Sequence, residues 1–258
     1  MRKVGGLIAV SDSYLQTLAN RYPNCVSIPK STITFGAFEK DFTVAIQNRL
    51  LQPSVIPTVQ GHISVVYVGR GGQDMQQAVR YLFNAFKKCL AEGNEGIKQV
   101  HFYFIGTSYA QAGKGIPTIA PIADETGIST YVTEITDRIP FYQTLNTLAD
   151  ATALFIPGST DPQYTASKIY PYVLAKKPLL AIFHPNSSVV SFLADCGVGT
   201  VLTFNQDTGV IESHIIQFLE SLVHRNYRAN EPKPDVIDAF SARVMTQKQC
   251  KLFNAVSL

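Results

Sequence analysis

Short apolar runs alternate along the chain with longer segments in which apolar residues recur at helical spacing. Ile63–Val68 is rich in β-branched residues and has the length of a strand, and Asp74–Leu90 follows it with apolar side chains three or four positions apart. The predicted strands are Ile63–Val68, Val100–Ile105, Tyr131–Ile135, Ala153–Ile156, Leu179–Phe183 and Thr200–Thr203. The predicted helices are Asp74–Leu90, Thr118–Glu125, Phe141–Leu148, Ser167–Leu174, Val189–Ala194 and Ile211–Val223.

The predicted strands are apolar on both faces, which is typical of parallel strands that are covered by helices on each side. Six strand-and-helix repeats follow one another without interruption. The pattern therefore predicts the α/β class, with a doubly wound, parallel, six-stranded sheet of the Rossmann-like type.

The chain before these repeats follows a different pattern. Leu7–Val10 predicts a further buried strand, and Ser11 or Ser13 is expected to cap a helix that runs through Leu15 and Leu18. Residues 23–60 are then interrupted by several prolines, which indicates a connecting segment rather than a second sheet. These prolines are Pro23, Pro29, Pro53 and Pro57.

The end of the chain carries a further predicted helix. A polar stretch follows His224, and Pro234 then opens one amphipathic helix that reaches Phe253. So much apolar surface has to pack against another part of the protein. The apolar residues of this helix are Val236, Ile237, Phe240, Val244, Leu252 and Phe253.

Composition narrows the class of protein. Of the 258 residues, 46% are hydrophobic and 16% are charged, which excludes a disordered chain and a coiled coil. No run of 18 apolar residues occurs, so we expect no integral membrane segment. The net charge of +3 arises in the tail after His224, and such a tail is more typical of a solvated helix face than of a nucleic-acid footprint. We therefore expect no nucleic-acid partner.

Four cysteines, Cys25, Cys89, Cys196 and Cys250, are scattered without a CxxC pair. This arrangement is typical of reduced, buried thiols, so we expect a cytoplasmic protein without a disulfide framework or a zinc site. The sequence also lacks HExxH, GxSxG and a Cys/His nucleophile pair. It therefore gives no support to a hydrolase or a metalloenzyme, and no metal is expected.

Ligands of a doubly wound sheet bind beyond the carboxyl ends of its strands. The first predicted strand ends in the segment Gly69–Gly72, which reads Gly-Arg-Gly-Gly, and a helix follows. The glycines would let backbone N–H groups approach a phosphate, and Arg70 could pair with the anion. The alternative is a tight glycine-rich turn with a solvated arginine.

The fourth predicted strand ends in a polar loop, Pro157–Lys168, that leads into a helix. Thr165 or Ser167 could cap this helix and leave free N–H groups facing a phosphate, and Lys168 would add a cation. The alternative, which the spacing favours equally, is a capped helix with a lysine on the surface.

Several segments together resemble the GT-B glycosyltransferases of the large retaining group that includes glycogen synthase. Ala151–Ala181 resembles that group's strand, donor loop, helix and following strand, and Val65–Gly72 resembles the "VYxGR" opening of its nucleotide-binding domain. Gly6–Pro23 resembles the last strand and helix of the acceptor-binding domain, and Ile28–Phe42 resembles the linker. The final helix resembles the one that crosses back to the first domain.

The resemblance implies three parts: residues 1–56 as the end of the N-terminal domain and the linker, 57–230 as the nucleotide-sugar-binding domain, and 231–258 as the returning helix. It implies transfer of a sugar from a nucleotide-diphosphate-sugar to an unknown acceptor, without a cofactor or metal. Arg70 and Lys168 would act catalytically by stabilising charge on the leaving diphosphate. The nucleotide base would lie at Arg138 and Ile139. The donor sugar would lie at Asp161 and Gln163. The nucleotide-sugar-binding residues are then Gly69, Gly71, Gly72, Arg138, Ile139, Asp161, Gln163, Thr165 and Ser167.

The sequence departs from this group in several places. Two glutamates that the group carries fall here at Gln163 and Pro171, and a usual lysine falls at Met75. A complete member also carries a full first domain before the strand at Leu7. We therefore expect these 258 residues to need that domain or a second copy, and to transfer no sugar alone. The alternative is a degenerate domain that binds a nucleotide or a partner without turnover.

Overall fold

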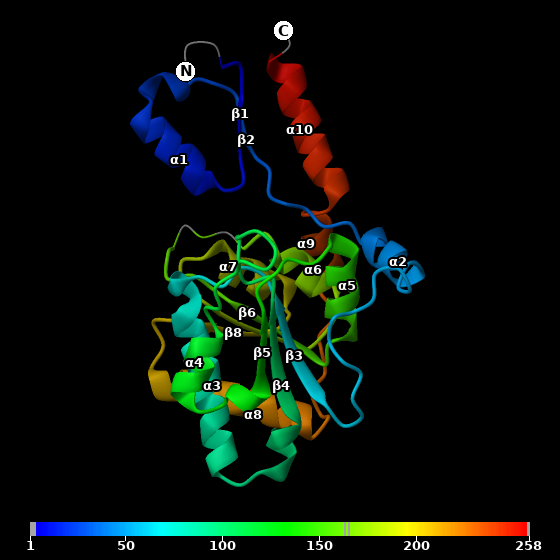
Figure 1. The fold of residues 1–258 in the computed structure, drawn as a ribbon. Coiled ribbons are helices and arrows are strands. Elements are labelled where there is room, and N and C mark those ends of the chain that lie inside the picture. Colours follow the sequence, from blue (N-terminus) through cyan, green and yellow to red (C-terminus); the bar gives the residue numbers. More distant parts are fainter. Residues whose placement is uncertain (1–3, 163, 165, 257–258) are drawn as a thin grey trace.

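The computed structural model describes residues 4–162, 164 and 166–256, and a six-stranded parallel sheet lies at its centre (Figure 1). The strand order is β5-β4-β3-β6-β7-β8, so the chain runs outward from β3 in one direction and then returns to fill the other side. This order confirms the predicted doubly wound α/β sheet. The strands are β3 (Ile63–Val68), β4 (Val100–Ile105), β5 (Val132–Ile135), β6 (Ala153–Pro157), β7 (Leu179–Phe183) and β8 (Thr200–Thr203).

Helices cover both faces of this sheet. Figure 1 shows α3 (Gln76–Ala91) and α4 (Ala120–Thr126) on one side and α5 (Phe141–Asp150) on the other. The last helix of the repeats, α8 (Thr208–Val223), packs against α3. The remaining two are α6 (Ile169–Leu174) and α7 (Ser188–Cys196), and short 3-10 helices span Pro23–Cys25, Gln73–Met75, Glu95–Gln99 and Ser129–Tyr131.

Burial along the sheet follows the position of each strand. Every residue of β3, β6 and β7 is buried, as we predicted for strands between two helical layers. The prediction is wrong for the edge strand β5, whose residues are all partly exposed. An edge strand has a neighbour on one side only, which leaves room for a polar residue such as Glu134.

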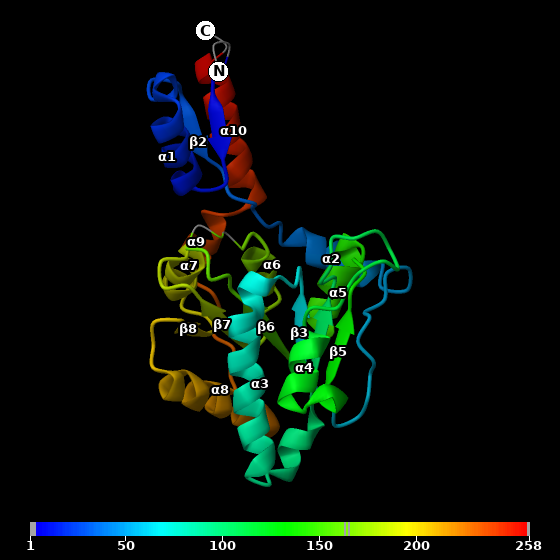
Figure 2. The same cartoon turned by 60° about the vertical axis from the view of Figure 1, so that its left-hand side comes forward.

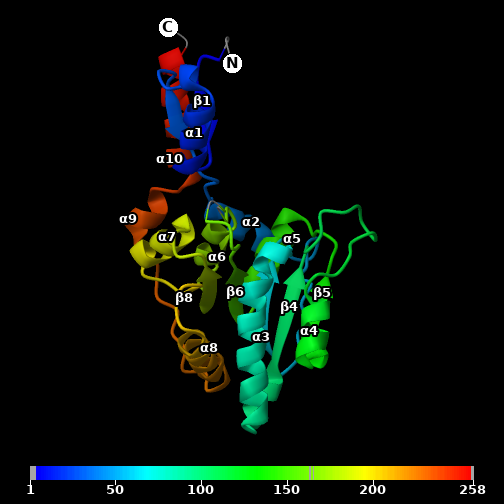
Figure 3. The same cartoon turned by 90° about the vertical axis from the view of Figure 1, so that its left-hand side faces the viewer.

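A smaller unit stands over the carboxyl ends of the sheet (Figures 1 and 3). It contains β1 (Leu7–Ala9), β2 (Lys30–Thr32), α1 (Asp12–Arg21) and α10 (Ala242–Val256). Figure 2 shows the two strands lying between the two helices. The first strand and the last helix of the described chain therefore share one small α/β unit.

The prediction that residues 23–60 form only a connecting segment is wrong. Lys30–Thr32 pairs in parallel with β1, and Lys40–Gln47 forms the helix α2. The apolar pattern does not indicate β2, because Lys-Ser-Thr is polar. Backbone hydrogen bonds hold this strand against β1. Leu7 N–H donates to the Pro29 carbonyl at 2.9 Å, and Ile33 N–H donates to the Ala9 carbonyl at 2.9 Å. The predicted boundaries at residues 56 and 230 stay predictions.

The single C-terminal helix that we predicted is in fact two helices, α9 (Pro234–Asp238) and α10. The chain leaves the helical path between them because it pairs there with the linker. Ala37 N–H donates to the Phe240 carbonyl at 3.2 Å, and Ala242 N–H donates to the Ala37 carbonyl at 3.1 Å. We call the contact between residues 36–37 and 240–242 the linker crossing. The apolar residues nevertheless pack largely as expected, although Phe253 is 49% exposed.

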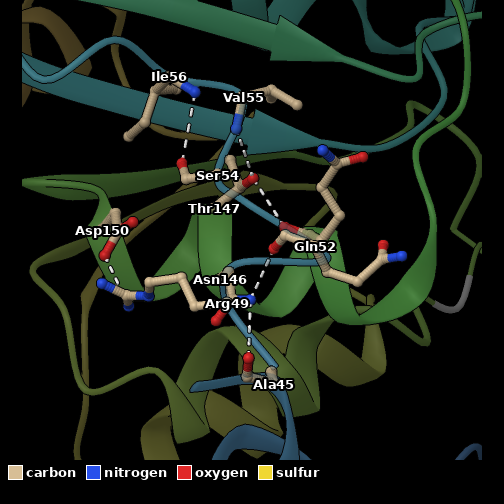
Figure 4. Close-up of polar contacts among 10 residues, drawn as sticks. Ala45, Arg49, Gln52, Ser54, Val55, Ile56, Asn146, Thr147 and Asp150 are labelled. Atoms are coloured by element: carbon tan, nitrogen blue, oxygen red, sulfur yellow. Dashed lines mark hydrogen bonds and ion pairs between the residues drawn. The ribbon is translucent and has the colours of Figure 1, made fainter. Parts of the chain in front are cut away.

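Polar side chains of α5 fasten the segment that follows α2 (Figure 4). The Asn146 amide donates to the Ala45 carbonyl at 2.9 Å and to the Gln52 carbonyl at 2.8 Å. Arg49 forms an ion pair with Asp150, with 2.9 Å between the nitrogen and the carboxylate oxygen. The chain from α2 to β3 therefore belongs to the large sheet unit rather than to the small one.

Two further expectations concern the membrane and the cysteines. Within the part of the chain that the structure describes, no helix combines the length and the apolar character needed to cross a membrane. Cys25, Cys89 and Cys196 are buried as predicted, whereas Cys250 is exposed. Burial raises the pKa of the Cys89 and Cys196 thiols to about 11, so both stay protonated near neutral pH.

Candidate functional site

A cleft opens at the carboxyl ends of β3 and β4, beside the point between β3 and β6 where the strand order reverses and where doubly wound sheets bind their ligands. Its volume is about 390 Å³. The cleft brings together five of the residues that the sequence singled out: Gly69, Arg70, Arg138, Ile139 and Lys168. The other residues of its walls are Val68, Ile105, Gly106, Tyr109, Phe141, Thr144 and Tyr172.

Arg70 follows β3 and is held in a fixed orientation. Its two terminal nitrogens donate to the two carboxylate oxygens of Asp74 at 2.9 and 2.7 Å. Its guanidinium also lies over the ring of Tyr164, 5.1 Å from the centroid. The hydrogen bond to Asp74 raises the pKa of Arg70 further, so this side chain is always charged.

Lys168 reaches the cleft from the start of α6. Burial, and next the charges of Arg138 and Arg70, lower the pKa of its amine to about 8. A Cβ atom added at Gly69 would lie 2.7 Å from this amine, so Gly69 leaves the space that the lysine occupies. We call Arg70, Arg138 and Lys168 the cation cluster. All three side chains line the same cleft.

Arg138 forms the opposite wall of the cleft, just beyond β5. Its guanidinium stacks over the ring of Tyr109 at 4.1 Å from the centroid, and Tyr109 is 68% exposed. Ile139 and Phe141 continue this wall toward α5. The wall therefore places apolar and aromatic side chains next to the cations, which suits a planar ring attached to an anion.

A carboxylate behind this wall holds the long loop between β4 and α4. Glu134 accepts hydrogen bonds from the backbone N–H groups of Thr118 at 3.0 Å, Ile119 at 2.9 Å and Ala120 at 2.7 Å. It also accepts one from the Thr107 hydroxyl at 2.6 Å. Glu134 thereby caps α4 and fixes the loop that carries Tyr109.

The glycine-rich loop differs from our expectation. We expected the Gly71 N–H to be free for a phosphate, but it donates to the Thr107 carbonyl at 2.7 Å. The Gly69 N–H similarly donates to the Ile105 carbonyl at 2.8 Å. A Cβ atom at Gly72 would lie 2.3 Å from both Arg70 Nη1 and Asp74 Oδ1. These glycines therefore make room for side chains and for pairing with β4.

The loop after β6 also corrects the sequence prediction. The helix α6 begins at Ile169 with Lys168 at its N-cap, so Ser167 does not cap it. Asp161 is exposed and its N–H donates to the Ser159 hydroxyl at 3.0 Å, and neither Asp161 nor Ser167 lines the cleft. Gln163 and Thr165 lie outside the described residues. The ligand roles of all these residues stay predictions.

Sequence reasoning missed several residues of this site: Asp74, Tyr109, Glu134 and Tyr164. Only Asp74 had a usable signal, because an aspartate four positions after an arginine is the spacing of a helical ion pair. Tyr109 and Glu134 reach the site through a long loop and an edge strand, so neither spacing nor periodicity indicates them. Among the described residues, no group of three or more His, Cys, Asp or Glu side chains could hold a metal ion.

A doubly wound sheet with this cleft, facing a second α/β unit across the carboxyl ends of its strands, has the architecture of the GT-B glycosyltransferases. Comparison with solved structures shows the same fold, as the sequence resemblance implied. No protein-family model matches the sequence, and no curated protein matches it significantly. The fold is therefore established by structural similarity.

Three of the similar structures contain UDP. HepE of Anabaena, in complex with UDP and glucose, is 14% identical with a TM-score of 0.62, over 98% of this chain and 64% of that one. TarM of S. aureus, whose complex includes UDP, is 14% identical with a TM-score of 0.60, over 98% and 44%. The pneumococcal O-GlcNAc transferase GtfA, with UDP and GlcNAc, is 13% identical with a TM-score of 0.61, over 99% and 46%. The chain thus spans roughly half the length of these proteins.

Proposed function

We propose that the cleft binds the diphosphate of a nucleotide sugar and that this chain supplies the donor-binding domain of a retaining glycosyltransferase, whose acceptor is unknown. The observation that carries this proposal is the cation cluster at the strand ends. Arg70 is balanced by Asp74, so the cluster keeps an excess of positive charge that the two negative charges of a diphosphate diester would neutralise. That UDP is bound in HepE, TarM and GtfA supports the same ligand class.

In sugar transfer from such a donor, the leaving diphosphate is the group that most needs to be stabilised. Negative charge grows on the diphosphate as the bond to the sugar breaks, and fixed positive charge next to it lowers the barrier. Arg70 and Lys168 are the groups we propose for this role. Arg138, Ile139 and the ring of Tyr109 would hold the base.

The sugar side of the donor remains a proposal from sequence. We propose that Asp161, Gln163, Thr165 and Ser167 contribute to it. Asp161 and Ser167 follow β6, on the loop that leads to Lys168, which supports a place near the donor. Their roles would show as a change in sugar selectivity rather than in nucleotide affinity.

Calorimetry with UDP, GDP and ADP, and with the three nucleosides, tests the proposal. We expect one diphosphate to bind at least about tenfold more tightly than its nucleoside, because charge-assisted hydrogen bonds contribute roughly 1.5–3 kcal/mol each. Arg70→Ala and Lys168→Ala should each remove most of that difference. Lys114→Ala, an exposed lysine of the β4–α4 loop, is the matched control and should change nothing. Equal affinity for nucleoside and diphosphate would contradict the proposal.

A second candidate function is nucleotide binding without turnover. Pro171 favours it: this residue lies within α6, where the resemblance places a glutamate that holds the ribose hydroxyls, and a proline side chain has no hydrogen-bonding group. Release of UDP, GDP or ADP from the corresponding glucose donors, followed over hours, tests for turnover. Release by these 258 residues would exclude the second candidate, and it would also contradict the expectation that they transfer no sugar alone.

A further inference from the structure

We propose that Asp74 is a positioning residue of the phosphate site, which fixes the guanidinium of Arg70 and joins the loop of Arg70 to the loop of Lys168. This inference rests on the proposed function, because it assigns a role in diphosphate recognition. Asp74 does not line the cleft, so it would act through Arg70 rather than by touching the ligand.

The first part of the argument is the geometry around Arg70. Asp74 binds it through both carboxylate oxygens, at 2.9 and 2.7 Å, which fixes the plane of the guanidinium as a single contact would not. The Tyr67 hydroxyl donates to the Arg70 carbonyl at 3.0 Å and holds the backbone of the same residue. Arg70 keeps further N–H donors for a ligand, since a guanidinium has five.

The second part is a link between the loops that follow the neighbouring strands β3 and β6. The Asp74 carbonyl accepts a hydrogen bond from the Thr160 N–H at 3.0 Å. The side chain of Ser159, which is only 2% exposed, also stabilises the ionised Asp74 carboxyl and lowers its pKa. Both partners belong to the loop between β6 and α6, which ends at Lys168. Asp74 therefore connects the loop of Arg70 with the loop of Lys168.

The third part is electrostatic. A carboxylate beside an anion site repels the ligand, so a residue with no positioning role would weaken diphosphate binding by its charge alone. Removing that charge should then strengthen binding. If Asp74 instead keeps Arg70 in place, its removal should weaken binding, because the freed arginine has to be ordered again. The two roles thus predict opposite signs.

The experiment measures binding of UDP, GDP and ADP, and of their nucleosides, to Asp74→Asn, Asp74→Ala and Asp74→Glu by calorimetry. We expect Asp74→Ala to weaken diphosphate binding about five- to tenfold and to leave nucleoside binding unchanged. Asp74→Glu should recover part of the loss, since it keeps a carboxylate for Arg70. In an Arg70→Ala background Asp74→Ala should no longer weaken diphosphate binding, and loss of the unpaired carboxylate should strengthen it.

A matched control removes another ion pair between an arginine and a carboxylate. Arg80 and Glu125 join α3 to α4 at 2.7 Å outside the cleft, so Glu125→Gln should not change affinity. Should the Asp74 variants fail to fold by circular dichroism, Ser159→Ala tests the same link and should weaken diphosphate binding about two- to threefold. Unchanged or tighter binding by a folded Asp74→Ala or Ser159→Ala would overturn the inference. If the unsubstituted protein does not prefer a diphosphate at all, the proposed function fails instead.

Discussion

Among single residues, Lys168 carries a positive charge in surroundings that disfavour it. Its amine is largely removed from water, and two further cations lie close by. Both effects act against the protonated form, and no acidic side chain is found to pair with it among the described residues. A charge in such a position is typical of sites that bind an anion, because the ligand supplies the missing partner.

Lys168 should therefore make diphosphate binding depend on pH. The diphosphate binds the protonated amine, whose pKa in the unliganded protein is about 8, so the contribution of Lys168 is nearly complete at pH 7 and is lost as the pH rises through 8. We expect binding about tenfold weaker at pH 9 than at pH 7, since roughly a tenth of the amine is protonated at pH 9. Calorimetry with ADP measures this, because its base does not ionise in that range.

The matched variant for this prediction is Lys168→Arg. A guanidinium stays charged at pH 9, so the fall in affinity between pH 7 and 9 should disappear. The pH dependence isolates Lys168 from Arg70, whose charge is constant over the whole range. The same tenfold fall in Lys168→Arg would show that another group causes it.

Among the secondary-structure elements, the periodicity of apolar residues predicted the large sheet well. The strands Leu179–Phe183 and Thr200–Thr203 have the predicted bounds, because both are short apolar runs between turn residues. The same signal missed β2, which is polar, and the break after Asp238, where no glycine or proline interrupts the helical pattern. Pairing with distant parts of the chain determines both features, and a local pattern contains no information on such pairing.

The candidate site was likewise predictable only in part. Strand ends and the glycine-rich loop located Arg70 and Lys168, because the topology of a doubly wound sheet gathers these ends in one place. The hydrogen bonding of the backbone could not be predicted: whether the Gly71 N–H is free depends on the Thr107 carbonyl, which lies in the loop after β4. The positions of Arg70 and Lys168 could thus be inferred from sequence, and the hydrogen bonds of the backbone groups and the side chains that reach the site through tertiary contacts could not.

The attachment of the α2 segment to α5 leads to a stability prediction. Asn146 is fully buried, and its amide is the partner of the Ala45 and Gln52 carbonyls (Figure 4). Asn146→Ala leaves both carbonyls without this donor, so we expect the free energy of unfolding to fall by about 2–4 kcal/mol. Urea denaturation measures this change.

Gln143→Ala provides the control for Asn146→Ala. Its amide donates to the Pro53 carbonyl at 2.8 Å from the same helix, but at an exposed position. Water can replace an exposed donor, so we expect a loss below about 1 kcal/mol. A loss of that size for Asn146→Ala as well would mean that water reaches the two carbonyls, and the attachment would then contribute little.

In the whole molecule, the linker crossing joins the small unit to the large sheet unit. Ala37 pairs with Ser241 in a parallel bridge, between a residue of the linker and one that precedes α10. The ring of Phe240 stacks on Tyr170 of α6 at 5.1 Å and contacts Phe192 of α7 at 4.9 Å. The small unit is therefore anchored on the two helices beside the loop of Lys168, through a contact that includes no residue of the cleft.

Gly36 makes this close approach possible, and its replacement should affect the small unit alone. A Cβ atom at Gly36 would lie 2.8 Å from the Phe240 carbonyl oxygen and 3.2 Å from the Ala242 nitrogen, both of which are backbone atoms. Gly36→Ala must therefore push the two segments apart and weaken the bonds that begin α10. We expect faster amide hydrogen exchange in β1, α1 and α10, with diphosphate affinity within about twofold of the unsubstituted protein.

Gly5→Ala is the control for Gly36→Ala, because a Cβ atom there would lie 3.6 Å from Val256 Cβ, an ordinary contact within the same small unit. Its exchange rates should match those of the unsubstituted protein. Unchanged exchange in Gly36→Ala would mean that the crossing adapts without cost. A tenfold loss of diphosphate affinity would instead show that the orientation of the small unit shapes the cleft. The crossing contacts α6, and the first turn of α6 follows Lys168, so we would attribute that loss to a displacement of Lys168. In a Lys168→Ala background, Gly36→Ala should then cause no further loss of diphosphate affinity.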